Sequence, residues 1–398
     1  MSEQEALFLF LMALGAFFMP FLSKRLMLPA AVGEIIYGIV IASLIPYGES
    51  HLVMVEYFSS LGFLILMYLA GLEIDFERFK NLPKKELWLY VLTFIPVAVV
   101  SWFLSYKLGL SWAFAIIFFT SGIGLLFPVL KDTGLLKTDF GQKLLIITMI
   151  GEILTLAGLM VLTIISKYGI TIDSARQILY LVIFFLVIYF IMKILKVLLW
   201  WRPDLQSIFL EVGNPTETGM RANFVILFAF VVFAAIFKIE FVVGAFVGGL
   251  MFALVFAGRD GVLDKLGGVG YGFFIPIFFI SVGMRVTFND FIQKDVIFLA
   301  LIIIASLFIT RVAGTLLLLF SSIEKPKLML VTTGLSFPLT ILVAVSSVCY
   351  DVGLISKVET SAVLLASMIS AIIFPWIFKG MIAIIMPSEN ISSQAVNK

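Results

Sequence analysis

Two short stretches decide the fold: GLLFP at residues 124–128 and GLSFP at residues 334–338. Both lie inside long apolar segments, where Gly and Pro are poor helix formers. The two prolines are 338 − 128 = 210 residues apart, which is more than half of the 398-residue chain. A chain that interrupts two hydrophobic segments with nearly the same pentapeptide predicts two related halves, each containing a broken helix.

The composition around these stretches indicates a membrane protein. Hydrophobic residues make up 62% of the chain and charged residues 13%, whereas a soluble domain is about 45–50% apolar. Apolar runs of about 18 residues or more recur along the whole length, which predicts a polytopic helical membrane protein in contact with the lipid bilayer. The net charge of +2 gives no reason to expect a nucleic-acid partner.

The reactive side chains needed for an enzyme or a cofactor site are scarce. The chain has one cysteine, Cys349, and one histidine, His51. One cysteine excludes an internal disulfide and a cysteine-based metal cluster, and metal sites need several convergent ligands. We therefore expect no enzyme activity, no cofactor and no resident metal.

The apolar runs predict an all-α polytopic fold of about 13 transmembrane helices. The expected spans lie near 6–23, 29–46, 55–72, 86–106, 111–130, 143–166, 177–200, 220–237, 241–258, 268–284, 295–320, 327–349 and 360–386. The polar connection 201–219 is the expected boundary between two halves. The transmembrane domain is expected over residues 1–388, followed by a short cytoplasmic tail at 389–398.

The distribution of basic residues predicts the orientation in the membrane. The connections after odd-numbered spans, with the C-terminal tail, hold 19 Lys and Arg residues, and the N-terminus and other connections hold 7. By the positive-inside rule, the N-terminus is expected outside and the C-terminus in the cytoplasm.

The 210-residue shift aligns more than the two pentapeptides. It places LGFLILMYLAGLEIDFERF (61–79) on YGFFIPIFFISVGMRVTFNDF (271–291), and with one residue of slip it places VGEIIYG (32–38) on VGAFVGG (243–249). The expected organisation is repeat one at about 6–166, a linker helix at about 177–200 and repeat two at about 220–386. Equivalent spans are an odd number apart, so the repeats are inverted, which is typical of secondary transporters.

Glu152 is the main candidate for an ion-binding residue, because charges inside the hydrocarbon layer are costly and usually functional. It stands about nine residues into its span, or roughly 14 Å at 1.5 Å per residue, near the middle of a ~30 Å core. A carboxylate at this depth can bind a proton or a small hard cation. The alternative is a structural pair with Arg311 that holds helices together.

Two further charges lie within the spans. Arg311 is also expected near the midplane, where a guanidinium needs an anionic or carbonyl partner. It would either tune the charge of Glu152 or cap the helix ends at a break. Glu34 lies closer to the cytoplasmic end of its span, where it would line an inner vestibule or reach interfacial water.

The broken helices supply the rest of the predicted site. Unwound backbone is tolerated at this depth only where it faces protein or a water-filled cavity. The breaks are expected at Gly122, Gly124, Pro128, Gly334 and Pro338, with hydroxyl oxygens from Thr120, Ser121, Ser336 and Thr340. Two such breaks would bring helix ends and bare carbonyls together at the midplane. The alternative is a pair of ordinary proline kinks.

Several motifs appear in the order found in one transporter family. They are LPAAVGEIIYGIVIAS, LGFLILMYLAGLEIDFERF, TSGIGLLFPVLKDTGLLKTDFGQ, GAFVGGL, FFIPIFFISVGM and TRVAGT. Together they resemble the monovalent cation:proton antiporters, in the branch that contains the glutathione-regulated potassium-efflux systems and related bacterial sodium/proton antiporters. The resemblance implies an inner-membrane homodimer with thirteen helices per chain, a dimerisation scaffold and a mobile core with two crossed, broken helices.

The resemblance also implies which residues carry the exchange. The family's acidic residue in the sixth span is an Asp preceded by another polar residue, and the matching pair here is Gly151 and Glu152. Ser121 and Gly122 match the family's threonine and the polar residue after it in the fifth-span break. With one carboxylate, we expect one proton to exchange for one monovalent cation, Na+ or K+, without net charge movement.

Three functions remain open at this point. The leading hypothesis is a cation:proton antiporter that works by alternating access. The second is a proton-coupled transporter of another solute on the same scaffold. The third is a channel or a membrane sensor subunit that performs no exchange.

Overall fold

The computed structural model describes residues 3–26, 28–44, 53–74, 83–169, 171–202, 209–210, 216–256, 260–286 and 288–386. Helices are the only regular secondary structure within these ranges. His51, the predicted tail 389–398 and most of the connection 201–219 lie outside the described residues.

The chain forms two compact units. Unit 1 consists of Met1–Phe76 and Ile164–Arg285, and unit 2 consists of Glu77–Thr163 and Val286–Lys398. Each unit combines two segments that are separated in sequence, and the second segment of unit 1 runs across the middle of the chain. Both predicted repeats are therefore divided between the two units.

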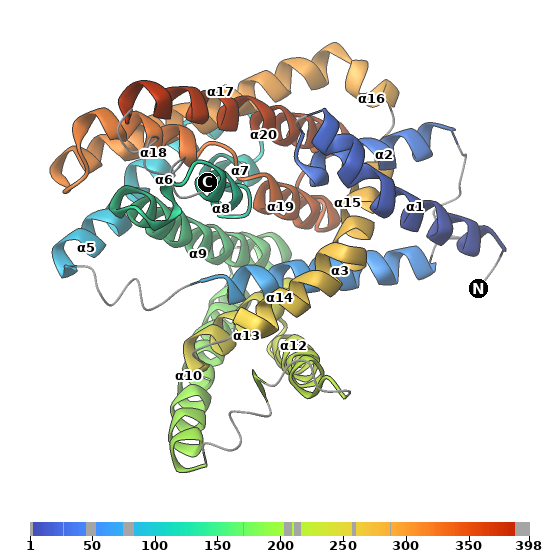
Figure 1. Cartoon of the computed structure of the whole chain (residues 1–398), viewed down its shortest axis with the longest axis vertical. Helices are drawn as coiled ribbons and strands as arrows, with labels where there is room; N and C mark the ends of the chain where they lie inside the picture. The colour runs from blue at the N-terminus through green and yellow to red at the C-terminus, as the bar shows by residue number, and fades with distance from the viewer. Residues whose placement is uncertain are drawn as a thin grey trace, which may run out of the picture. The chain divides into compact units, whose positions relative to one another are not determined.

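Among the described residues, unit 1 contains the end of α9 (Asp139–Tyr168), the first three helices and five later helices (Figure 1). They are α1 (Glu3–Arg25), α2 (Ala30–Leu44), α3 (Val53–Leu72), α10 (Ile172–Trp201), α12 (Thr218–Ile236), α13 (Phe241–Val255), and α14 (Asp260–Val269), which continues through a π-helical turn (Gly270–Phe274) into α15 (Ile275–Met284). Within this unit, α3 packs against α13 and α15, α2 packs against α15, and α12 packs against α13.

Glycines allow two helix pairs of unit 1 to approach backbone to backbone. Between α2 and α15, Gly38 meets the carbonyl oxygen of Ile280, and Gly283 meets that of Ile35. Between α3 and α13, Gly249 meets the carbonyl oxygen of Tyr68, and Gly71 meets that of Phe246. A Cβ atom on Gly38 or on Gly249 would lie 2.0 Å from the facing carbonyl oxygen. The two sets are related by 249 − 38 = 211 and 280 − 68 = 212 residues. These separations lie within two residues of the 210-residue shift found in the sequence, and the inverted repeat stays a prediction.

Unit 2 holds the interrupted helices. Its elements are α5 (Lys84–Leu92), α6 (Phe94–Lys107), α7 (Ala113–Phe119), α8 (Leu126–Asp132), most of α9 (Asp139–Tyr168), α16 (Phe288–Ile292), α17 (Lys294–Thr315), α18 (Leu328–Gly334), α19 (Leu339–Asp351) and α20 (Lys357–Ile385), with short 3-10 turns at Leu135–Lys137, Leu316–Phe320 and Lys325–Lys327. The short α7 packs against α6, α17 and α19, and α20 packs against α17 and α19 (Figure 1).

The helices confirm a multi-pass membrane protein. In the described part of the chain, nine helices are long and apolar enough to cross a membrane, or ten if the bent pair of α18 and α19 counts as one span. The helices α2 and α13 are apolar but shorter, with 15 residues each. Every expected span coincides with a helix or an interrupted helix. The total of about 13 crossings stays a prediction.

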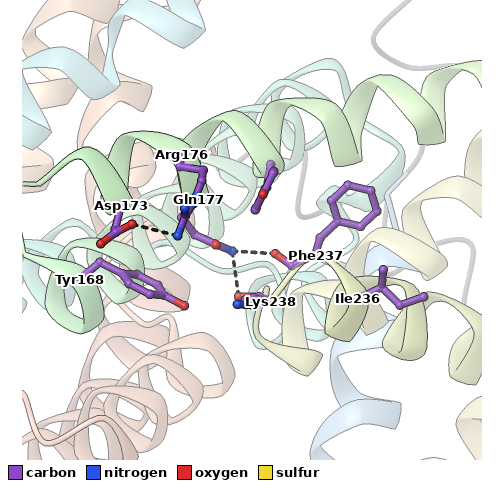
Figure 2. A pocket seen from close by; sticks show the side chains of 8 residues that line it. Tyr168, Asp173, Arg176, Gln177, Ile236, Phe237 and Lys238 are labelled. Atoms are coloured by element: carbon purple, nitrogen blue, oxygen red, sulfur yellow. Dashed lines mark hydrogen bonds and ion pairs between the residues drawn. The ribbon is translucent and has the colours of Figure 1, made fainter.

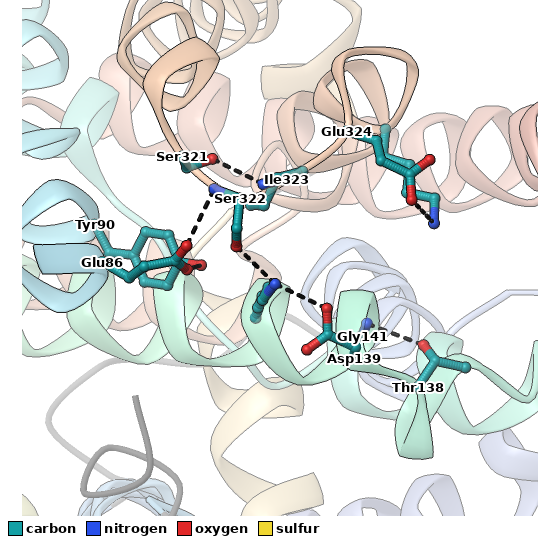
Figure 3. A network of polar contacts seen from close by, with 11 residues as sticks. Glu86, Tyr90, Thr138, Asp139, Gly141, Ser321, Ser322, Ile323 and Glu324 are labelled. Atoms are coloured by element: carbon teal, nitrogen blue, oxygen red, sulfur yellow. Dashed lines mark hydrogen bonds and ion pairs between the residues drawn. The ribbon is translucent and has the colours of Figure 1, made fainter. Parts of the chain in front are cut away.

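A polar network holds the beginning of α9 in unit 2 (Figure 3). The Glu86 carboxylate accepts hydrogen bonds from the backbone N–H of Ser322 at 3.1 Å and from the hydroxyl of Tyr90 at 2.7 Å. Lys143 donates to the Ser322 hydroxyl at 2.7 Å and pairs with Asp139 at 2.8 Å. The network joins α5 and α9 to the connection after α17, and so fixes the helix that carries Glu152.

In unit 1, a buried amide joins α10 to the end of α12 (Figure 2). Gln177 donates hydrogen bonds to the carbonyl oxygens of Phe237 at 2.6 Å and Lys238 at 3.0 Å. These carbonyls lie just past the end of α12, where helices leave acceptors without intrahelical partners. Beside this contact, Asp173 and Arg176 form an ion pair at 2.8 Å. The amide contact therefore satisfies the end of one helix with a side chain from another.

Candidate ion-binding site

The first break separates α7 from α8 over residues 120–125. Thr120 and Ser121 are 0% exposed, and Ile123 is 1% exposed. Buried backbone without helical hydrogen bonds needs partners from elsewhere in the protein. The question for this break is therefore which groups accept hydrogen bonds from its N–H groups.

Side chains of α9 supply those partners. The carboxylate Oε2 of Glu152 accepts a hydrogen bond of 2.9 Å from the N–H of Ile123. The Oγ1 of Thr155 accepts one of 3.1 Å from the N–H of Ser121 and donates one of 2.7 Å to the Gly151 carbonyl. Glu152 is 1% exposed, so the structure places its carboxylate in the interior, directly against the break.

Thr155 was not identified from the sequence. It follows Glu152 by three residues on α9, a spacing that puts both side chains on neighbouring positions of one helix face. That spacing was available in the sequence. What was missing was a reason to expect a threonine, rather than another carboxylate, beside the break.

At the second break, the first backbone N–H groups donate to carbonyls of the preceding helix, α18. The pair α18 and α19 is bent by 44°, and residues 335–338 between them are not helical. The N–H of Leu335 donates to the Val331 carbonyl at 3.0 Å, and the N–H of Ser336 donates to the Thr333 carbonyl at 3.0 Å. These are local turns that close the end of α18.

The two pentapeptides occupy different places relative to their breaks. Pro128 is the third residue of α8, in the first turn, where a missing N–H costs no helical hydrogen bond. Pro338 directly precedes α19. Pro128 therefore lies in the first turn of a helix and Pro338 just before one, and neither kinks a continuous helix.

The structure brings the two breaks together within unit 2. A Cβ atom on Gly124 would lie 2.5 Å from the Oγ1 of Thr340. One on Gly122 would lie 3.0 Å from a side-chain carbon of Ile341 and 3.6 Å from the Cβ of Pro338. The glycines of the first break thus leave room for the start of α19.

Arg311 joins the ends of the two half-helices. It lies on α17 with 0% exposure. Its Nε donates to the Leu335 carbonyl at 3.2 Å, and its Nη2 donates to the Thr120 carbonyl. These carbonyls stand at the C-terminal ends of α18 and α7, where the helix dipole is negative. Of the two roles expected for Arg311, the contacts fit the capping of helix ends.

The candidate hydroxyls differ in their hydrogen bonds. Thr120 and Ser336 donate to carbonyls of their own helices, Ile116 at 2.8 Å and Thr332 at 2.7 Å. The Ser121 Oγ is buried and makes no hydrogen bond among the described residues.

The remaining acidic candidate belongs to the other unit. Glu34 is buried on α2 of unit 1, whereas the other candidates all belong to unit 2. Within the described ranges, no three His, Cys, Asp or Glu side chains gather into a metal site.

Unwound helices that meet at a buried charge define the class of secondary transporters, whose substrate sites lie at such breaks. The sequence model of the family described as "Sodium/hydrogen exchanger, transmembrane" matches residues 13–383. The chain therefore belongs to the sodium/hydrogen exchanger family, and the family resemblance expected from the sequence motifs is confirmed.

Relatives and a solved structure agree with this assignment. One relative is named as a candidate antiporter, Na(+)/H(+) antiporter 3 of Methanocaldococcus jannaschii. It is 32% identical over 289 residues, which cover 69% of this chain and 70% of the relative. YjbQ of Bacillus subtilis, also named as a candidate Na(+)/H(+) antiporter, is 26% identical over 95% of this chain, which spans 63% of YjbQ.

The fold comparison extends over nearly the whole molecule. The structure of the sodium proton antiporter MjNhaP1 from Methanocaldococcus jannaschii at pH 8 matches with a TM-score of 0.61 and 13% identity, covering 97% of this chain and 99% of that one. At 13% identity, the match shows a similar fold. The family and these relatives are transporters and not enzymes.

Proposed function

We propose that the protein is a secondary active transporter that exchanges a monovalent cation, Na+ or K+, for H+. One observation carries the proposal: the buried Glu152 carboxylate accepts a hydrogen bond from the unwound backbone at Ile123. A carboxylate in this position binds either a proton or a hard cation through its oxygens. Membership of the sodium/hydrogen exchanger family and the names of the relatives support the same exchange.

The ligands proposed for the cation are oxygen atoms from both breaks. Glu152 supplies the charge, and Ser121 is the leading hydroxyl because its oxygen has no partner among the described residues. Thr340 faces Gly124 and is the next candidate. Thr120 and Ser336 are weaker candidates, since their hydroxyls already donate within their own helices.

The charge balance of the proposed site favours electroneutral exchange. Arg311 is directed to two negative helix ends, and its guanidinium stays protonated during transport. The exchangeable charge is then the single carboxylate of Glu152. When it takes up one proton for each monovalent cation released, no net charge crosses the membrane.

We further propose alternating access in which unit 2, which carries the site, moves as a body during transport. The division into two compact units supports this proposal. The proposed setting is the plasma membrane, as a homodimer, with the N-terminus outside and the C-terminus in the cytoplasm, following the distribution of basic residues.

The test is cation flux driven by a pH gradient in proteoliposomes, with Na+, K+ and Li+ compared in turn. We expect Glu152→Gln to reduce exchange to the level of empty vesicles while the purified protein stays folded, because the amide oxygen still accepts the Ile123 hydrogen bond. The matched control is Glu240→Gln in unit 1, whose carboxylate pairs with Lys167.

Three outcomes contradict parts of the proposal. Undiminished exchange in the Glu152 variant removes this residue from the mechanism. Proton-coupled uptake of a labelled organic solute, without a response to the three cations, favours the transporter of another solute. Cation flux faster than a carrier can turn over favours a channel.

A further inference from the structure

An aromatic ring packs beside the first break and beside Gly151, the neighbour of Glu152. Phe94 is the first residue of α6 and is 3% exposed. Its ring packs edge-on against Phe119, the last residue of α7, with 5.8 Å between ring centroids. Phe94 therefore lies beside the beginning of the first break, where Thr120 and Ser121 leave the helix.

The same ring occupies the space in front of Gly151, the neighbour of Glu152 on α9. A Cβ atom on Gly151 would lie 2.5 Å from the Cζ of Phe94, 2.6 Å from its Cε1 and 2.7 Å from the Cβ of Ser121. Contacts this short do not occur between real atoms, so a side chain at position 151 would require both the Phe94 ring and Ser121 to shift. Glycine at 151 and phenylalanine at 94 are complementary in volume.

An unsatisfied hydroxyl lies at the same place. Ser121 is 0% exposed, and its Oγ makes no hydrogen bond among the described residues. A buried hydroxyl without a partner costs roughly 1–3 kcal/mol. Such a group beside an ion-binding carboxylate is a ready oxygen ligand, and the neighbouring ring restricts how much water can share that space.

We propose that Phe94 is a specificity-determining residue of the ion site, an inference that rests on the proposed function. The ring excludes water and any second side chain from the Gly151 side of Glu152. A cation bound to Glu152 and Ser121 then meets protein oxygens of fixed number and position on that side. Discrimination between cations of different size depends on the number and field strength of such ligands.

The proposal makes a directional claim about selectivity. Phe94→Ala removes the ring and opens a space beside polar groups that is large enough for water. Water molecules adjust to ions of any size, so the preference of the wild-type protein among Na+, K+ and Li+ should flatten. We expect the ratio of kcat/KM between the best and the poorest cation to fall by about tenfold, within the range of pocket contacts.

The experiment measures KM and kcat for each cation in proteoliposomes for wild type, F94A, F94L and F374A. Leucine retains part of the ring volume, so F94L should give an intermediate ratio. Phe374 is a matched control, since it is a buried aromatic residue of the same unit that stacks on Phe308 with centroids 5.8 Å apart. F374A should keep the wild-type ratio even where its total exchange is lower.

A volume swap tests the contact itself. Gly151→Ala alone should lower stability and exchange because its Cβ collides with the ring and with the Cβ of Ser121. In thermal unfolding of the purified proteins, G151A should cost less stability in the F94A background than in wild type, because only the contact with Ser121 remains. An equal cost of G151A in both backgrounds overturns the claim that the ring blocks this position.

The outcomes separate this inference from the proposed function. If wild type shows no exchange above Glu152→Gln, the proposed function and this inference both fail. If wild type exchanges and F94A keeps the wild-type selectivity ratio, only the role of Phe94 is wrong. If F94A transports nothing, the measurement becomes the rise in unfolding temperature that each cation gives to the detergent-purified protein. If these rises have the same order and spread in F94A as in wild type, the proposal is again overturned.

Discussion

The two helix breaks of unit 2 look alike in sequence but are stabilised in different ways. Between α7 and α8, the N–H groups of Ser121 and Ile123 donate to side chains of α9, Thr155 and Glu152. Between α18 and α19, the N–H groups of Leu335 and Ser336 donate to carbonyls one turn back in the same chain. The N–H donors of the first break depend on another helix, whereas these two N–H donors of the second break are satisfied within α18.

This difference bears on the proposed function. In the proposed exchange, a proton or cation at Glu152 changes the charge on the group that accepts the Ile123 hydrogen bond, so ion binding would act directly on the first break. The N–H groups of Leu335 and Ser336 donate to carbonyls of α18 instead, so in the proposed mechanism they do not depend on the charge of Glu152. Arg311 connects the two because it donates to one carbonyl at each break.

The largest loss of stability is expected from Arg311→Ala, which affects both breaks together. It leaves two buried helix ends without their cationic donor and a cavity in place of a large side chain. We expect about 3–5 kcal/mol of destabilisation and loss of exchange. Thermal unfolding in detergent and the proteoliposome flux assay measure the two effects.

A lysine at position 311 tests whether charge alone is sufficient. Lys cannot reproduce the planar fork that reaches two carbonyls, so Arg311→Lys should recover only part of the stability. A wild-type unfolding temperature in Arg311→Ala would mean that the two breaks are not held together by this residue.

A smaller effect is expected from Thr155→Val, which acts on the first break alone. Valine has a similar shape but leaves the N–H of Ser121 without its acceptor, at a cost of about 1–3 kcal/mol. Exchange should fall because the break next to Glu152 is no longer fixed. Thr155→Ser keeps the hydroxyl and is the control, and equal exchange in both variants would contradict a positioning role for this oxygen.

The smallest effect is expected from Ser336→Ala in the second break. The Ser336 hydroxyl donates to the Thr332 carbonyl of the helix that precedes it, and the backbone turns around it remain. We expect a change of about 1 kcal/mol or less and nearly normal exchange. A loss of exchange larger than that of Thr155→Val would reverse the comparison and make Ser336 a cation ligand.

Much of this protein was predictable from local sequence signals. Apolar runs depend on neighbouring residues only, so hydropathy located the long apolar helices, although no expected span covered the short α16. The rarity of buried charges pointed to Glu152 and Arg311. Gly and Pro in GLLFP and GLSFP indicated that two spans are interrupted. The motif order indicated the family, which the match over residues 13–383 confirmed.

The partners of the buried groups were decided by the tertiary structure. The sequence offered either Glu152 or helix ends as the partner of Arg311, and packing placed its guanidinium at the carbonyls of Thr120 and Leu335. The roles of Thr155 and Phe94 also depend on contacts between different helices. A sequence pattern fixes which residues face inward, but the acceptor for a buried donor is set by whichever helix packs against it.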